Sequence, residues 1–156
     1  MANDAMRAGP RGSSDQEAFV GPYVETFTFS RSAIVGTLAF SLPLRFGTTW
    51  RVRDIELAVL EVIAASSTNP TFTVGKTGDT AAFMTATATP NGTAAGTIVA
   101  ATKANQSLWG TDDYLIDSDT DLIFDQTIAG SGGSVTGVVQ IRVLLEPVSG
   151  TYFSNG

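Results

Sequence analysis

The 156-residue chain contains neither cysteine nor histidine. Without cysteine it has no disulfide, no thiolate nucleophile and no zinc-binding cysteine cluster. Without histidine it has no Ser-His-Asp or Cys-His catalytic pair, no imidazole metal ligand and no imidazole pH switch. Catalysis would have to depend on carboxylates, hydroxyls or the lysines Lys76 and Lys103. We therefore expect a protein that is not an enzyme and that binds no cofactor.

Positive charge and long apolar runs are also scarce. The chain has nine basic and fifteen acidic side chains, which gives a formal net charge of −6. A nucleic-acid-binding surface needs a basic face, so we expect no nucleic-acid partner. No window approaches the ~20 apolar residues of a membrane span, and residues 1–18 lack the roughly 7–15-residue apolar stretch of a secretory signal. We therefore expect no membrane partner.

Short alternating segments are what the chain has in abundance. Apolar and polar residues alternate over residues 23–30, 71–75 and, most regularly, 135–146. This period of two is typical of half-buried strands, and the sixteen glycines supply the turns between them. Six to nine such strands predict an all-β fold, an antiparallel β-sandwich or jelly roll. We expect it to occupy residues 19–156 as a single domain, preceded by an extended N-terminal arm at residues 1–18.

Three internal segments are harder to interpret. Residues 50–65 fit an amphipathic helix by the spacing of their apolar residues, but they are rich in β-branched side chains and lack an N-cap. The composition favours a strand there, and the helix stays open. Residues 77–97 are mostly Thr, Ala and Gly, which predicts a long surface excursion with room for one helical turn. Residues 114–124 consist of an apolar segment, a polar turn and a second apolar segment, and this pattern predicts a hairpin.

Three aspartates with alternating spacing suggest a metal site. Asp117, Asp119 and Asp121 copy the first three ligand positions of a Ca²⁺-binding loop. Leu122 and Ile128 stand where such a loop requires glycine and glutamate, so it is not an EF-hand. Two interpretations remain: a looser Ca²⁺ site, or an exposed acidic turn without metal, which the pattern favours.

Charge is distributed unevenly along the chain. Six of the nine basic residues lie within the first 53 positions, while six of the fifteen acids lie between 112 and 125. This asymmetry suits contacts between copies, or a basic arm on an acidic partner. We expect Arg7 and Arg11 in the arm to bind a partner.

Aromatic residues supply a second set of candidate contacts. We expect Trp50 and Trp109 to act as aromatic anchors for a partner. The same two tryptophans, with Tyr114 and Tyr152, would be the platform of a sugar-binding site; the simpler interpretation is that they fill the core or subunit seams.

Four segments together carry a family resemblance. They are residues 50–57, from Trp50 to Leu57; residues 72–83, which include Gly75, Lys76 and Thr77; the 114–124 segment; and the closing strand 137–146. Across residues 48–148 their order resembles the small β-sandwich virion proteins of tailed bacteriophages, of the capsid decoration or cement type.

The resemblance implies a non-enzymatic structural role on the surface of a capsid, after synthesis in the host cytoplasm. The implied partners are the major capsid protein and sister copies, commonly in a trimer. The alternatives are another head or tail component, or a carbohydrate- or receptor-binding module.

Overall fold

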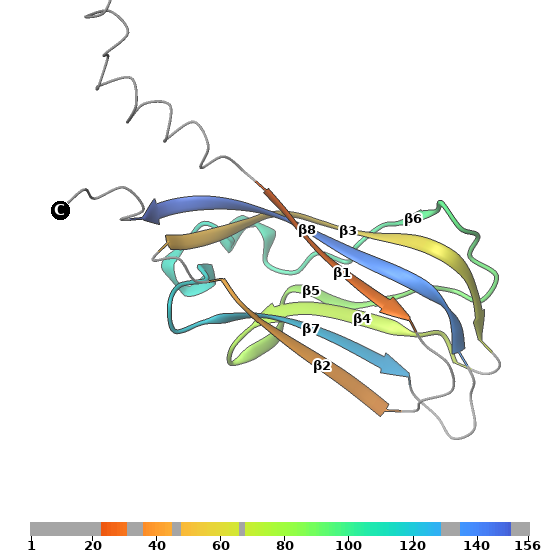
Figure 1. Cartoon of the computed structure of the whole chain (residues 1–156). Helices are drawn as coiled ribbons and strands as arrows, with labels where there is room; N and C mark the ends of the chain where they lie inside the picture. Colours follow the sequence, from red (N-terminus) through yellow and green to blue (C-terminus); the bar gives the residue numbers. More distant parts are fainter. Residues whose placement is uncertain (1–22, 31–35, 45–47, 66–67, 129–134, 151–156) are drawn as a thin grey trace, which may run out of the picture.

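Two antiparallel sheets face each other in the computed structural model, which describes residues 23–30, 36–44, 48–65, 68–128 and 135–150 (Figure 1). Sheet A has the strand order β1-β8-β3-β6, and sheet B has the order β2-β7-β4-β5. The predicted antiparallel β-sandwich is therefore confirmed. The strands are β1 (Tyr23–Ser30), β2 (Gly36–Pro43), β3 (Thr48–Ala65), β4 (Thr71–Lys76), β5 (Asp79–Ala88), β6 (Ile98–Val99), β7 (Asp121–Ile128) and β8 (Val135–Gly150).

The strands pair in nested order along the chain. β1 pairs with β8, β2 with β7, β3 with β6 and β4 with β5, all antiparallel. Successive pairs alternate between the two sheets, as when one long hairpin is folded over itself. Further pairing of β3 with β8 and of β4 with β7 joins the four pairs into the two sheets.

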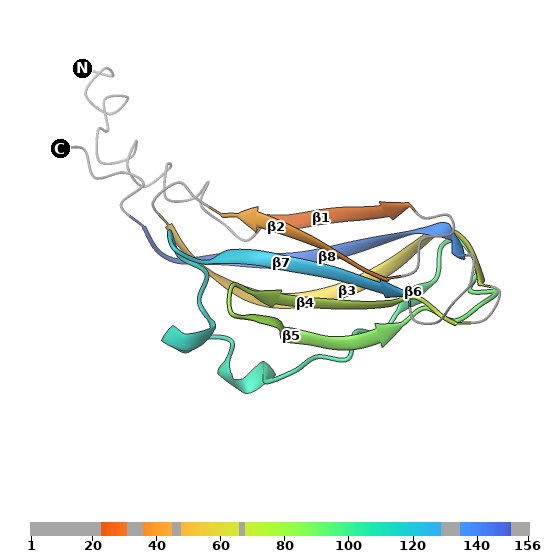
Figure 2. The same ribbon diagram turned by 90° about the horizontal axis from the view of Figure 1, so that it is seen from below.

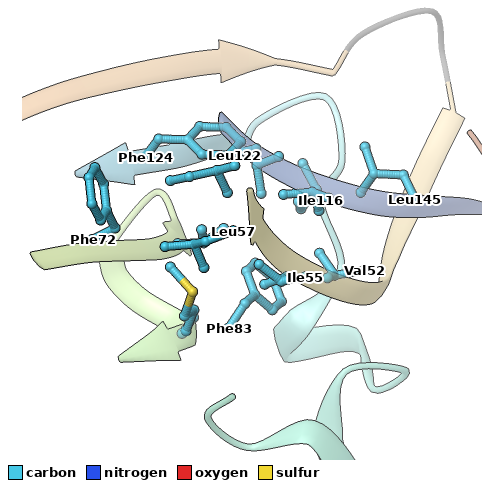
Figure 3. Packing of buried hydrophobic residues seen from close by; sticks show 14 of the residues in the cluster. Val52, Ile55, Leu57, Phe72, Phe83, Ile116, Leu122, Phe124 and Leu145 are labelled. Carbon is cyan, nitrogen blue, oxygen red and sulfur yellow. The ribbon is translucent and has the colours of Figure 1, made fainter. Parts of the chain in front are cut away.

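The core lies between the sheets and follows the alternation in the sequence. In β7 the side chains of Leu122, Phe124, Gln126 and Ile128 are buried, whereas those between them are half-buried. Figure 3 shows large apolar side chains from both sheets meeting in this space. The largest fully buried ones are Phe72, Phe83 and Phe124. Burial of this continuous apolar layer is the main force that holds the two sheets together.

The 50–65 segment is a strand, as the composition favours. It forms most of β3, which has 18 residues and pairs with β8 along its whole length through four register shifts. Its other edge is also satisfied, because the Val59 amide donates to the Thr97 carbonyl (2.8 Å) and the Ile63 amide to the Thr93 carbonyl (3.1 Å). β3 is thus a central strand. Its register shifts against β8 between Val52 and Asp54 and between Val59 and Ala64 interrupt the alternation of faces, which explains why its apolar residues do not keep to one face.

Two other expectations are wrong. Residues 79–88 do not form a surface excursion but strand β5, in which Ala82, Phe83 and Met84 are buried. Residues 114–124 do not form a hairpin of two strands: residues 112–114 are a 3₁₀ turn, and Ile116 makes a single bridge with Trp50. The arm at residues 1–18 lies outside the described residues.

Candidate interaction surfaces

The two tryptophans lie inside the sandwich. Trp50 is 5 % exposed and Trp109 is 3 % exposed. The Trp109 ring meets Phe83 edge-on, with the ring centroids 5.8 Å apart, and its Nε1 donates a hydrogen bond to the Ala104 carbonyl at 2.6 Å. This burial corrects the expectation that Trp50 and Trp109 bind a partner, because both rings are core side chains. Tyr114 is half-buried against Phe83, and Tyr152 lies outside the described residues.

The three aspartates of the proposed calcium site are not brought together. Asp117 accepts hydrogen bonds from the Thr120 hydroxyl and from the Asp119 amide, and the Thr120 bond lowers the pKa of Asp117 below its ordinary value. Asp121 begins β7, where its amide donates to Thr77 Oγ1 at 2.9 Å. Among the described residues no three acidic side chains form a group that could hold a metal ion. The geometry is that of a tight acidic turn.

An ion cluster that the sequence analysis did not identify lies near one end of sheet A. Arg51 and Arg53 lie on the same side of β3 and both contact Oε2 of Glu146 on β8, with their Nε atoms each 3.1 Å away. Next to the cluster is a hollow of about 340 Å³ lined by Arg51, Val52, Arg53, Gln106, Ser107, Trp109 and Gly110. The hydrogen bond from Arg51 holds the pKa of Glu146 below its ordinary value of 4.5.

Replacing Glu146 with glutamine should destabilise the fold in a pH-dependent way. Since the folded-state pKa is depressed, the ion pair stabilises the protein above pH 4.5, and this stabilisation is lost as the pH falls through the folded-state value. For a partly exposed pair we expect Glu146→Gln to lower the free energy of unfolding by up to about 1 kcal/mol at pH 7. Urea unfolding of both proteins over a pH series measures this difference. Glu61→Gln, at an exposed position of β3, is the control. A Glu146→Gln difference that stays constant down to acid pH would contradict the assignment.

Among the described residues, exposed apolar side chains lie near one another in two places on the sandwich, while Leu108 and Val148 are exposed elsewhere. On β2, Leu38 is 37 % and Phe40 is 41 % exposed, although both lie in register with the buried residues Gln126 and Phe124 of β7. They therefore project from the core-facing side of an edge strand. Figure 2 shows β1 and β2 along one side of the sandwich, with β5 on the other.

The second exposed apolar group lies on sheet A. Leu60 and Val62 of β3 are 42 % and 54 % exposed, and Ile98 of β6 is 52 % exposed. Ile98 is paired with Ala58, two residues before Leu60.

No helix in the described part of the chain has the length and apolar composition to span a membrane.

Comparison with known proteins returns structural neighbours only. No protein-family model and no curated protein matches the sequence. The chain is similar to a chain in the structure of infectious bursal disease virus Gx strain, with 18 % identity and a TM-score of 0.28 over 82 % of this chain. It is also similar to the infectious bursal disease virus VP2 subviral particle, with 17 % identity and a TM-score of 0.29 over 83 % of this chain. The aligned regions cover 37 % and 38 % of those chains, so this chain matches little more than a third of either one.

Proposed function

We propose that this protein is a structural component of a virion, and more narrowly a decoration or cement protein that stabilises a phage head. The observation that carries the proposal is the nested strand pairing of β1 with β8, β2 with β7, β3 with β6 and β4 with β5. This order supports a jelly roll, the fold that builds viral capsid and lectin domains. The tailed-phage assignment is supported by the sequence resemblance alone.

The proposed mechanism is a clamp that binds only the assembled shell. A ligand of the assembled state stabilises it by mass action, and several weak contacts to neighbouring subunits add up to high avidity. The sandwich supplies the rigid body of the clamp, because its interior is filled by large side chains such as Phe72 and Phe124. Arg7 and Arg11 in the arm would contact acidic groups of the major capsid protein, and sister copies would contact one another through exposed apolar strands.

The leading alternative is a carbohydrate- or receptor-binding module, since jelly rolls also form lectins. Stacking of a sugar needs an exposed aromatic face, and the burial of Trp50 and Trp109 removes two of the four candidates. Binding on a glycan array that disappears with a chelator would favour this alternative. A location in another part of the head or in the tail is the second alternative, and imaging of labelled particles distinguishes it.

Neutralising the arm should weaken binding to capsids. We expect the double substitution Arg7→Gln and Arg11→Gln in the full chain to reduce affinity for purified capsids about tenfold, because two charge contacts are lost. Co-sedimentation with capsids at low salt measures the affinity. The control Thr80→Glu with Ala86→Glu gives the same net charge through exposed positions on β5. Equal affinity of the two double variants would exclude the arm from the mechanism.

A further inference from the structure

The four sheet edges of the sandwich are protected to very different degrees. The outer edge of β5 is covered by the segment 102–104. The Thr85 amide donates to the Thr102 carbonyl (3.0 Å), and the Ala104 amide donates to the Phe83 carbonyl (2.9 Å). The β6 edge is only two residues long. The β1 sequence carries a charged residue, Glu25. β2 is the exception: it has eight residues, and among the described strands it pairs with β7 alone.

β2 also lacks the features that prevent an edge strand from pairing with a strand of another molecule. Proteins usually protect such edges with charged side chains, bulges or prolines within the strand. Residues 33–44 contain no charged side chain, β2 pairs with β7 without a register shift, and its one proline, Pro43, is its last residue. Each copy carries a net charge of −6, so two copies repel each other in general, and an uncharged edge is where they approach at least cost.

We propose that β2 is a self-association site at which a second copy of this chain adds its own β2 antiparallel, around a two-fold axis at Ala39. This register places Leu38 opposite Phe40 of the partner copy, and Thr37 opposite Ser41 of the partner copy. Directly paired residues lie on the same face of a sheet, so the exposed apolar side chains of both copies meet on the core-facing side. Pro43, which has no amide hydrogen to donate, stays outside this pairing of residues 36–42.

Such a contact joins sheet B of two copies into one continuous eight-stranded sheet. It is isologous, so it predicts a dimer, or a larger assembly with two-fold axes, in place of the trimer that the family resemblance implies. The inference rests on the proposed structural role in that it names the surface through which sister copies associate.

A charge placed on the edge should abolish the dimer. In sedimentation velocity we expect the unaltered protein to have the mass of a dimer and Leu38→Lys to have the mass of a monomer with an unchanged far-ultraviolet spectrum. Leu60→Lys is the matched control, because Leu60 is similarly exposed (42 %) but lies on β3. A monomeric or trimeric unaltered protein, or a Leu60→Lys variant that dissociates while Leu38→Lys does not, would overturn the proposal.

A cysteine cross-link tests the register without depending on the stability of the lysine variant. The chain has no cysteine of its own, so Ala39→Cys introduces a single thiol. Paired Cα atoms in an antiparallel sheet lie about 4.5–5.5 Å apart, within the range of a disulfide. We expect Ala39→Cys to form a disulfide-linked dimer under mild oxidation and Ala86→Cys, at an exposed position of β5, to remain monomeric on a non-reducing gel. Cross-linking of both variants to the same extent would overturn the proposed register.

These tests separate the dimer contact from the virion role. A protein that dimerises through β2 but is absent from viral particles keeps the contact and refutes the proposed function. A protein that is present in particles but monomeric in solution, with no Ala39→Cys cross-link, keeps the proposed function and refutes the dimer contact.

Discussion

Substituting Phe83 with alanine should lower the free energy of unfolding by about 3–5 kcal/mol, the usual cost of removing a large buried aromatic side chain. Phe83 is fully buried in β5 at the centre of an aromatic group, with Trp109 and Tyr114 edge-on to its ring at 5.8 and 6.2 Å. These contacts connect sheet B to the loop that contains both 3₁₀ turns. Truncation therefore leaves a cavity and also removes the packing that holds this loop on the sandwich.

Guanidinium unfolding followed by tryptophan fluorescence measures this loss directly, since Trp109 contacts Phe83. Leu108→Ala is the control, because Leu108 precedes Trp109 in the chain but is 42 % exposed. We expect that control to change the unfolding free energy by no more than about 0.5 kcal/mol. Similar losses for the two variants would mean that β5 does not contribute Phe83 to the core.

Substituting Gly137 with alanine should be the second severe change. Gly137 has a backbone φ of 111°, which residues with a side chain rarely adopt. A Cβ there would lie 2.6 Å from the backbone carbonyl oxygen of Val62, at the irregular pairing of β3 with β8. We expect a loss of roughly 1–2 kcal/mol for the backbone conformation and about 1–3 kcal/mol more for the steric clash.

Gly96 provides a matched comparison for this clash. Its φ is 85°, but a Cβ there would meet no atom within 4 Å beyond Gly96 itself and its two neighbours in the chain. Gly96→Ala should therefore show only the conformational part of the loss, and thermal or urea unfolding of the two variants gives the steric part by difference. Equal losses would contradict the close approach of β3 and β8 at Gly137.

Much of the fold follows from alternation that is visible in the sequence. β1, β4 and β8 were predicted because their apolar residues recur with a period of two. β5 was missed because Thr and Ala dominate it and Phe83 is its only aromatic residue; small side chains fit a sheet but give no periodic signal. The pairing of β1 with β8 joins residues more than a hundred positions apart, and the spacing of residues along the chain does not encode such contacts.

The interaction surfaces were less predictable than the fold. Trp50 and Trp109 are large and amphipathic, which suits an interface and a core equally, and only their burial distinguishes the two. The Arg51–Arg53–Glu146 cluster depends on the pairing of β3 with β8. The exposure of Leu38 and Phe40 depends on the place of β2 at the end of its sheet, although the absence of charge in residues 33–44 was a usable signal.

Quantitative mass spectrometry of purified particles tests the central claim most directly. The proposed function requires a virus that encodes this chain; particles of that virus are the sample, and the quantity measured is the copy number of this protein relative to the major capsid protein. The account predicts a fixed stoichiometric ratio that survives washing and density-gradient purification. A protein that is found only outside the particles would contradict a structural role in the virion.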